Sequence, residues 1–150
     1  MKKLTQSIVF LLLLGITPVT MAVDDGDNNA ANDSRQLVQF PEMMERHMMA
    51  NMRDHLAAIN EIMVSLGNDE LDKAADIAEY RLGMSALESH GAKHRARFMP
   101  KGMRQAGTTM HRSASRFARK AQEGDLQAAI KAFAKITAAC VTCHSGYRIR

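Results

Sequence analysis

The stretch that decides the fold is the last one, 126-LQAAIKAFAKITAACVTCHSGY-147. Its apolar and ligand-type side chains recur at alternating intervals of four and three residues: Leu126, Ile130, Phe133, Thr137, Cys140, His144 and Tyr147. That period matches one face of an α-helix. The pair Gly124-Asp125 in front of it supplies a helix stop and an N-cap. The sequence therefore predicts a long helix with these side chains on its inner face.

Three more helical segments precede this one, each bounded by helix-breaking residues. The first is predicted to run from Pro41 to about Leu66, with an inner face of Met49, Met52, Leu56, Ile59, Met63 and Leu66. The second spans about Glu70 to Ser89, after the stop at Gly67 and an N-cap at Asp69, and buries Leu71, Ala74, Ala75, Ala78 and Leu82. The third begins near Met103 and buries Met103, Ala106, Met110, Ala114, Phe117 and Ala121. Between the second and third lies a loop within 90–102.

Four amphipathic helices with mostly short connections predict an all-α fold, an up-down-up-down antiparallel four-helix bundle. The length of 150 residues suits one domain with a single core. The formal net charge is only +4, and the chain has no interleaving of basic and aromatic residues. We therefore expect no nucleic-acid partner.

The N-terminus has the pattern of a secretory signal peptide. Lys2 and Lys3 precede the apolar run IVFLLLLGI (8–16), and a small-residue cleavage site follows at 20–22. The apolar run is much shorter than the roughly 20 residues that span a bilayer. We therefore expect cleavage after Ala22, export to the periplasm and no stable membrane insertion. Residues 23–36 are rich in Asp, Asn and Gly, which predicts a flexible leader.

Both cysteines of the chain fall in the motif Cys140-Val-Thr-Cys143-His144. Thiols three residues apart lie on one face of a helix, where both can add to the vinyl groups of one haem. The next residue, His144, can then bind the iron, and C-x-x-C-H is the attachment signature of haem c. The sequence predicts one covalent haem c per chain, near the C-terminus.

Three other uses of the motif were weighed. A structural zinc site needs four nitrogen or sulfur ligands, and the chain has no second cysteine pair. A redox dithiol of the thioredoxin kind needs a helix N-terminus after a strand, which this sequence does not offer. A plain disulfide between Cys140 and Cys143 is the strongest rival in an oxidising compartment, but it leaves His144 on the inner face unexplained.

The C-terminal sequence, from Cys140 through His144 and Tyr147 to Arg148, resembles that of the class II cytochromes c, which are cytochrome c′ and its low-spin relatives of the c-556 type. A glycine followed by an Asp-x-Ala-Ala segment (Gly67, then 72–75) adds to the likeness. The resemblance covers 37–150 and implies a cytochrome c′-like four-helix haem domain. It implies that His144 is the proximal ligand, that Tyr147 packs on the haem and that Arg148 lies near its proximal side. For Arg148 a solvated cation at the helix end is an equal alternative.

The distal side of the haem is predicted at the first helix. Met52 belongs to its predicted inner face, and in the family the distal residue lies about four turns before the glycine that closes this helix, here Gly67. We expect Met52 as the sixth iron ligand, with His55 as the runner-up. Ordinary core packing of Met52 above an open iron is the alternative.

Two functions follow from these expectations. In the first, a six-coordinate iron shuttles one electron between periplasmic redox proteins, without enzymatic activity. In the second, a five-coordinate iron binds NO or CO in an apolar pocket. Met or His on the distal side favours electron transfer, and Leu or Phe favours gas binding. The resemblance also implies a possible homodimer through the first helices.

Other metal-binding residues were considered. The first helix holds five Met and two His between Met43 and His55, a set that suits Cu(I) but also suits a bundle core. His90 and His94 share a helical face if the second helix extends that far. His111 flanks the inner face of the third helix, where it reaches a haem edge or propionate or serves as a partly buried structural residue.

Overall fold

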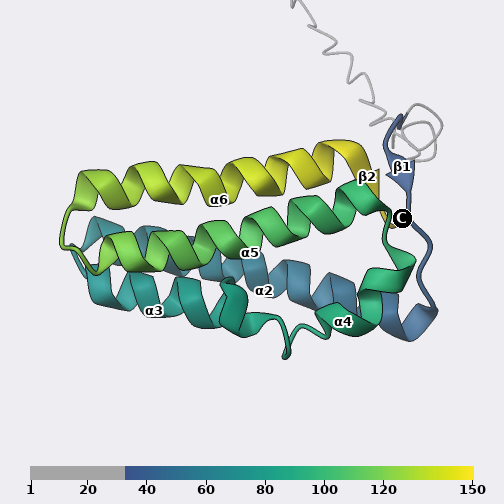
Figure 1. Cartoon of the computed structure of the whole chain (residues 1–150), viewed down its shortest axis with the longest axis horizontal. Coiled ribbons are helices and arrows are strands. Elements are labelled where there is room, and N and C mark those ends of the chain that lie inside the picture. The colour runs from purple at the N-terminus through teal and green to yellow at the C-terminus, as the bar shows by residue number, and fades with distance from the viewer. Residues whose placement is uncertain (1–32) are drawn as a thin grey trace, which may run out of the picture. The chain divides into compact units, whose positions relative to one another are not determined.

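Residues 33–150 are the part of the chain that this computed structural model describes (Figure 1). The predicted signal peptide at 1–22 and most of the predicted leader lie outside the described residues. The four long elements are α2 (Glu42–Gly67), α3 (Leu71–Arg81), α5 (Lys101–Ala121) and α6 (Leu126–Gly146). The prediction of an all-α fold is confirmed.

Packing between these helices is uneven. Helix α5 packs against α6 along its length, and α3 packs against both α2 and α5 (Figure 1). The centre of the core is aromatic, with the rings of Phe117 and Phe133 in an edge-to-face contact at 5.7 Å between centroids. Small alanines on α3, α5 and α6 surround this pair and let the helices approach closely.

A short parallel pairing joins the two ends of the described chain. Strand β1 (Gln36–Leu37) pairs with β2 (Tyr147–Arg148), with Gln36 opposite Tyr147. The Val38 amide donates to the Arg148 carbonyl at 2.8 Å, and Arg150 pairs with Glu45 at 2.9 Å. The end of α6 therefore lies beside the beginning of α2. The sequence did not predict either strand.

The predicted inner faces had mixed outcomes. All six predicted residues of α5 are buried. On α2 the prediction was wrong in register, because Leu56 is 71% exposed and Met63 52% exposed. The buried side chains of α2 are instead Met48, Ala58, Ile62, Ser65 and Leu66. The helix carries apolar residues on two neighbouring faces, and only tertiary packing selects between them.

On α6 the inner face is likewise rotated from the prediction. Its buried residues are Ala129, Phe133, Ile136 and Ala139, whereas Ile130 is 44% exposed and His144 is exposed. The alanines on the buried face of α6 let α5 and α6 approach each other more closely than the larger residues of the predicted face would. Gly124 takes a left-handed conformation at φ 79°, and the Asp125 carboxylate accepts from the Ala128 amide, as the stop-and-cap prediction required.

The second predicted helix was too long at its C-terminal end. Helix α3 stops at Arg81, and the chain continues as two short 3-10 helices, η1 (Met84–Ala86) and η2 (Ala96–Phe98), with the four-residue α4 (Ala92–Arg95) between them. The Nδ1–H of His111 donates to the Leu82 carbonyl at 2.7 Å, and the Ser115 hydroxyl accepts from the Met84 amide. These contacts with α5 hold the chain away from a helical path. The N-cap of α3 is Glu70, because Asp69 takes a left-handed conformation at φ 58°.

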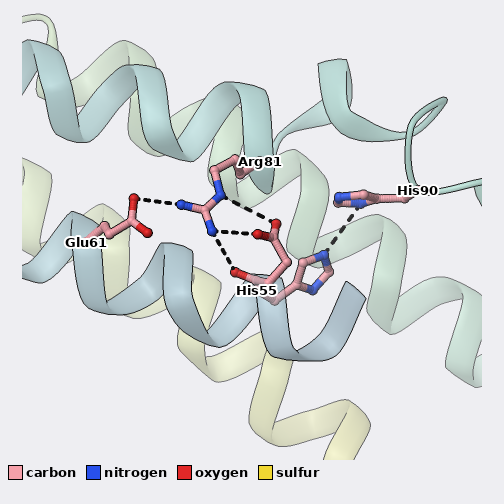
Figure 2. A network of polar contacts seen from close by, with 5 residues as sticks. His55, Glu61, Arg81 and His90 are labelled. Atoms are coloured by element: carbon pink, nitrogen blue, oxygen red, sulfur yellow. Dashed lines mark hydrogen bonds and ion pairs between the residues drawn. The ribbon is translucent and has the colours of Figure 1, made fainter. Parts of the chain in front are cut away.

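Arg81, the last residue of α3, anchors this helix to α2. Its guanidinium pairs with Asp54 at 2.6 Å and with Glu61 at 2.7 Å (Figure 2). These hydrogen bonds lower the pKa of Asp54 and raise that of Arg81. The ion-pair network therefore joins the C-terminal end of α3 to α2.

Helix α6 is also long and apolar enough to cross a membrane by length and composition, with a mean hydropathy of 1.3. Core helices of globular domains satisfy the same criteria, and α6 packs along α5.

Candidate functional site

The two cysteines lie on the last two turns of α6 and are both half-buried free thiols. Their spacing of three residues puts them on one side of the helix. Burial raises the pKa of Cys140 and of Cys143. Both groups are therefore protonated thiols at neutral pH, held at the edge of the core without a disulfide.

His144 follows directly in the last turn of α6 and is exposed. Its backbone carbonyl accepts a hydrogen bond from Arg35 at 3.3 Å, whereas its ring makes no hydrogen bond with a described residue. The imidazole is therefore available to an external ligand such as a metal.

Cys143 packs into what we call the methionine cluster, a second apolar core at this end of the molecule. Its buried members are Val38, Met48 and Met103, and half-buried side chains packed against them are Phe40, Met52, Met99, Cys143, Tyr147 and Ile149. The structure thus brings Met52, Cys143 and Tyr147 together from α2, α6 and β2. Cys140, one turn earlier, packs against the main core instead.

Tyr147 is held in place by a glycine at the start of α5. A Cβ atom at Gly102 would collide with the Tyr147 hydroxyl, so a larger residue there would displace the ring. Arg148 is half-buried in β2. Of the two residues that the resemblance assigns to the haem surroundings, Tyr147 packs in the same cluster as Cys143, and Arg148 follows it in β2.

A groove of about 460 Å³ lies on the other side of the thiol-bearing turns, between α5 and α6. Small residues line it, among them Gly102, Ala106, Ala139 and Gly146. Neither cysteine belongs to its lining. The thiols face the core side of α6, where the methionine cluster begins.

His55 lies outside the methionine cluster and inside a different group, which we call the histidine cluster: His55, His90 and His111. The ring centroids are 4.9 Å apart for His55 and His90, 5.6 Å for His90 and His111, and 6.2 Å for His55 and His111. Figure 2 shows the first pair, whose nearest ring nitrogens are 3.5 Å apart. His55, the runner-up iron ligand, is thus grouped with other imidazoles rather than with Cys143.

All three imidazoles have pKa values below the ordinary value for histidine. Burial is the main cause for each, and it lowers the pKa of His55 to about 4. Mutual repulsion adds to the effect, because a positive charge on one ring disfavours a charge on the next. The cluster is therefore neutral at pH 7.

These depressed pKa values predict a loss of stability in mild acid. A group with a lowered pKa in the folded state contributes stability above its unfolded value near 6.5, and loses it as the pH falls toward the folded value. For His55 the loss between pH 7 and pH 5 should be about 2 kcal/mol. Urea unfolding at both pH values measures it. Between pH 7 and pH 5 the variant His55→Asn should lose about 2 kcal/mol less stability than the wild type. An equal loss in both proteins would contradict a lowered pKa for His55.

The structure contradicts the predicted pairing of His90 with His94 on one helix, and it divides the Met/His run of α2 between exposed and buried positions. His90 and His94 do not share a helix, because α3 ends at Arg81; His90 is buried in a turn and His94 is exposed in α4. The Met/His run of α2 is split between surroundings, since Met43 is 75% exposed while Met48 is buried. Within residues 33–150 no group of three or more His, Cys, Asp or Glu is arranged to hold a metal ion.

Sequence reasoning missed five members of the methionine cluster: Val38, Phe40, Met48, Met99 and Ile149. Met48 was left off the predicted inner face of α2, which was wrong in register. Met99 precedes Pro100 in a segment without helical period, and Val38 depends on the unpredicted strand pairing. No local pattern indicates either of these two.

Comparison of the chain with protein-family models, with curated protein sequences and with solved structures found no match. A functional assignment therefore depends on the site itself.

Proposed function

We propose that this protein is an exported c-type cytochrome that carries one haem c on Cys140 and Cys143 and transfers one electron at a time. The observation that carries the proposal is the C-x-x-C-H motif at the end of α6, with two free thiols beside an apolar cluster that includes Met52. Among residues 33–150 no second cysteine pair competes for another use of the motif.

We infer that α2, α3, α5 and α6 form the up-down-up-down four-helix bundle of a class II cytochrome c. The extensive contact of α5 with α6, of α3 with α2 and α5, and the meeting of the two chain ends through β1 and β2 support this arrangement. It brings the beginning of α2 to the level of the C-x-x-C-H motif, which the distal assignment requires.

The residues present fit a haem at this place. Each thiol would form a thioether by adding its S–H across a vinyl group, a step in which the thiol proton is retained on the new ethyl carbon. When bound, the haem supplies a one-electron iron couple. The exposed His144 ring would hold the iron on one side, and the flexible thioether side chains of the methionine cluster can rearrange around a bulky group.

Met52 is the sixth ligand that this arrangement favours. It comes from α2 and packs in the same cluster as Cys143, whereas His55 packs with His90 and His111. Met/His ligation gives a higher reduction potential than bis-histidine ligation. The apolar neighbours Val38 and Phe40 would keep water from the iron. A methionine at this place favours electron transfer over gas binding.

A ferric optical and EPR spectrum of the purified haem protein tests this proposal. A low-spin signal with the weak far-red sulfur-to-iron band is the expected result. A high-spin ferric haem whose ferrous form binds NO or CO would instead support the gas-binding alternative. A protein that matures without haem would contradict both.

The compartment and partners follow from the same proposal. The predicted signal peptide directs the chain to the periplasm, where redox proteins would be its partners. The exposed Leu56, Met63 and Val64 give α2 an apolar outer face, which supports the homodimer that the resemblance implies.

A further inference from the structure

A buried cation with no partner among residues 33–150 lies next to the histidine cluster. Arg95, at the end of α4, is only 8% exposed, and its Nε and Nη1 atoms are fully buried without a hydrogen-bond partner. Leaving a guanidinium buried without hydrogen bonds or a counter-charge costs several kcal/mol. No carboxylate of the described chain forms an ion pair with Arg95, and burial lowers its pKa unopposed. Something outside residues 33–150 should satisfy it.

The groups around Arg95 decide the charge of that missing partner. Its positive charge acts on all three imidazoles of the histidine cluster and contributes to the depressed pKa of each. A metal cation between these rings would be repelled by the guanidinium, and no three-ligand metal site exists among the described residues. Arg95 and imidazole N–H groups are hydrogen-bond donors, which suit an anion.

The acidic side chain that acts on the cluster, Asp54, already pairs with Arg81. The charge of the Asp54 carboxylate opposes the lowering of the pKa of His55 and of His90, but both of its oxygens accept hydrogen bonds from Arg81. His47 adds a further imidazole on the side of His90. The surroundings of Arg95 therefore contain donors and positive or neutral groups, with the one nearby carboxylate paired elsewhere.

We propose that Arg95 and the histidine cluster form a binding site for a carboxylate. A guanidinium is a planar, charged donor that suits a carboxylate, and a carboxylate at one edge of the Arg95 guanidinium would give one of its two buried N–H groups the acceptor that it lacks. The imidazoles of His90 and His55, on which the Arg95 charge acts, carry N–H groups that can donate to the same anion.

Two sources can supply this carboxylate: a propionate of the attached haem, or a free small carboxylate. The propionate source rests on the proposed function. It is favoured by position, since His55 lies one helical turn after Met52 on α2, and Arg95 lies four residues before Met99. The same two segments thus carry the histidine cluster and the methionine cluster.

The test uses thermal unfolding of the full chain in sodium acetate, with sodium chloride at equal ionic strength as the reference. It compares the wild type with the haem-free double variant Cys140→Ala/Cys143→Ala, each with Arg95→Gln or Lys93→Gln added. Lys93 is exposed, two residues away and equal in charge, so it is a matched control. In the haem-free protein we expect acetate to raise Tm by roughly 5 °C at concentrations about tenfold above Kd. Arg95→Gln should abolish the rise and Lys93→Gln should retain it.

The haem-loaded protein identifies the source. If a haem propionate occupies the site, acetate should not raise the Tm of the haem-loaded protein specifically. If a free carboxylate occupies it, acetate should raise the Tm of both the haem-loaded and the haem-free protein. If neither the haem-free nor the haem-loaded protein shows a rise in Tm that is specific to acetate and depends on Arg95, the proposal is overturned. A wild type that never attaches haem would refute the proposed function. Its change in Tm with acetate would still show whether the carboxylate site exists.

A second readout covers a haem-free variant that does not fold. In the haem-loaded protein, loss of Arg95 should raise the pKa of the propionate, so the reduction potential of Arg95→Gln should vary with pH between 5 and 8 where that of Lys93→Gln does not. Identical pH profiles in the two variants would overturn the propionate contact.

Discussion

Replacing Cys140 and Cys143 together by alanine should abolish covalent haem. The variant, matured in a periplasm with haem-attachment machinery, should lose all its haem in acid-acetone extraction, because no thioether bond remains to hold the group. Haem staining after denaturing electrophoresis measures the loss. The single variants should each keep one thioether and stain more weakly than the wild type.

Thr142→Ala is the matched control for this experiment. Thr142 lies between the two cysteines, is exposed, and its hydroxyl only donates to the Ala138 carbonyl within α6. It should keep the full haem content. Haem that survives extraction in the double cysteine variant would show that the attachment is made elsewhere.

Met52→Ala should convert a low-spin ferric haem to high spin. Removing the Met52 sulfur opens the sixth coordination position of the iron. This should also abolish the far-red sulfur-to-iron band and lower the reduction potential. Optical and EPR spectra of the ferric protein measure the change. The loss of half-buried side-chain volume should cost at most about 2–3 kcal/mol of stability, so the protein should remain folded.

Met63→Ala is the control for Met52. It removes the same side chain from the same helix at a position that is 52% exposed, so its spectrum should match the wild type. His55→Asn should also remain low spin, because His55 packs against His90. An unchanged Met52→Ala spectrum together with a high-spin His55→Asn would transfer the ligand assignment to His55.

The sequence was sufficient to predict the helices but not which face of each is buried. On α5 the apolar residues form a single stripe from Met103 to Ala121, so the buried face was predictable. On α2 two apolar faces compete, and the choice of Ile62 over Met63 follows only from the neighbours α3 and α5. The end of α3 depends on a hydrogen bond from His111, 29 residues further along the chain. Such contacts have no local signature.

The candidate site divides in the same way. Cys140, Cys143 and His144 are contiguous, so their motif is visible in the sequence. Met52 was inferred from the predicted inner face of the first helix and from the resemblance, and the structure groups it with Cys143. The histidine cluster and Arg95 come from three separate segments and are brought together by tertiary packing alone.

The most direct test of the central claim is the intact mass of the exported wild-type protein under denaturing conditions. The account predicts a chain from Val23 to Arg150 that carries one haem, with the haem retained on a peptide containing Cys140 and Cys143. A bare chain, or one that carries only a disulfide between these two cysteines, would contradict it.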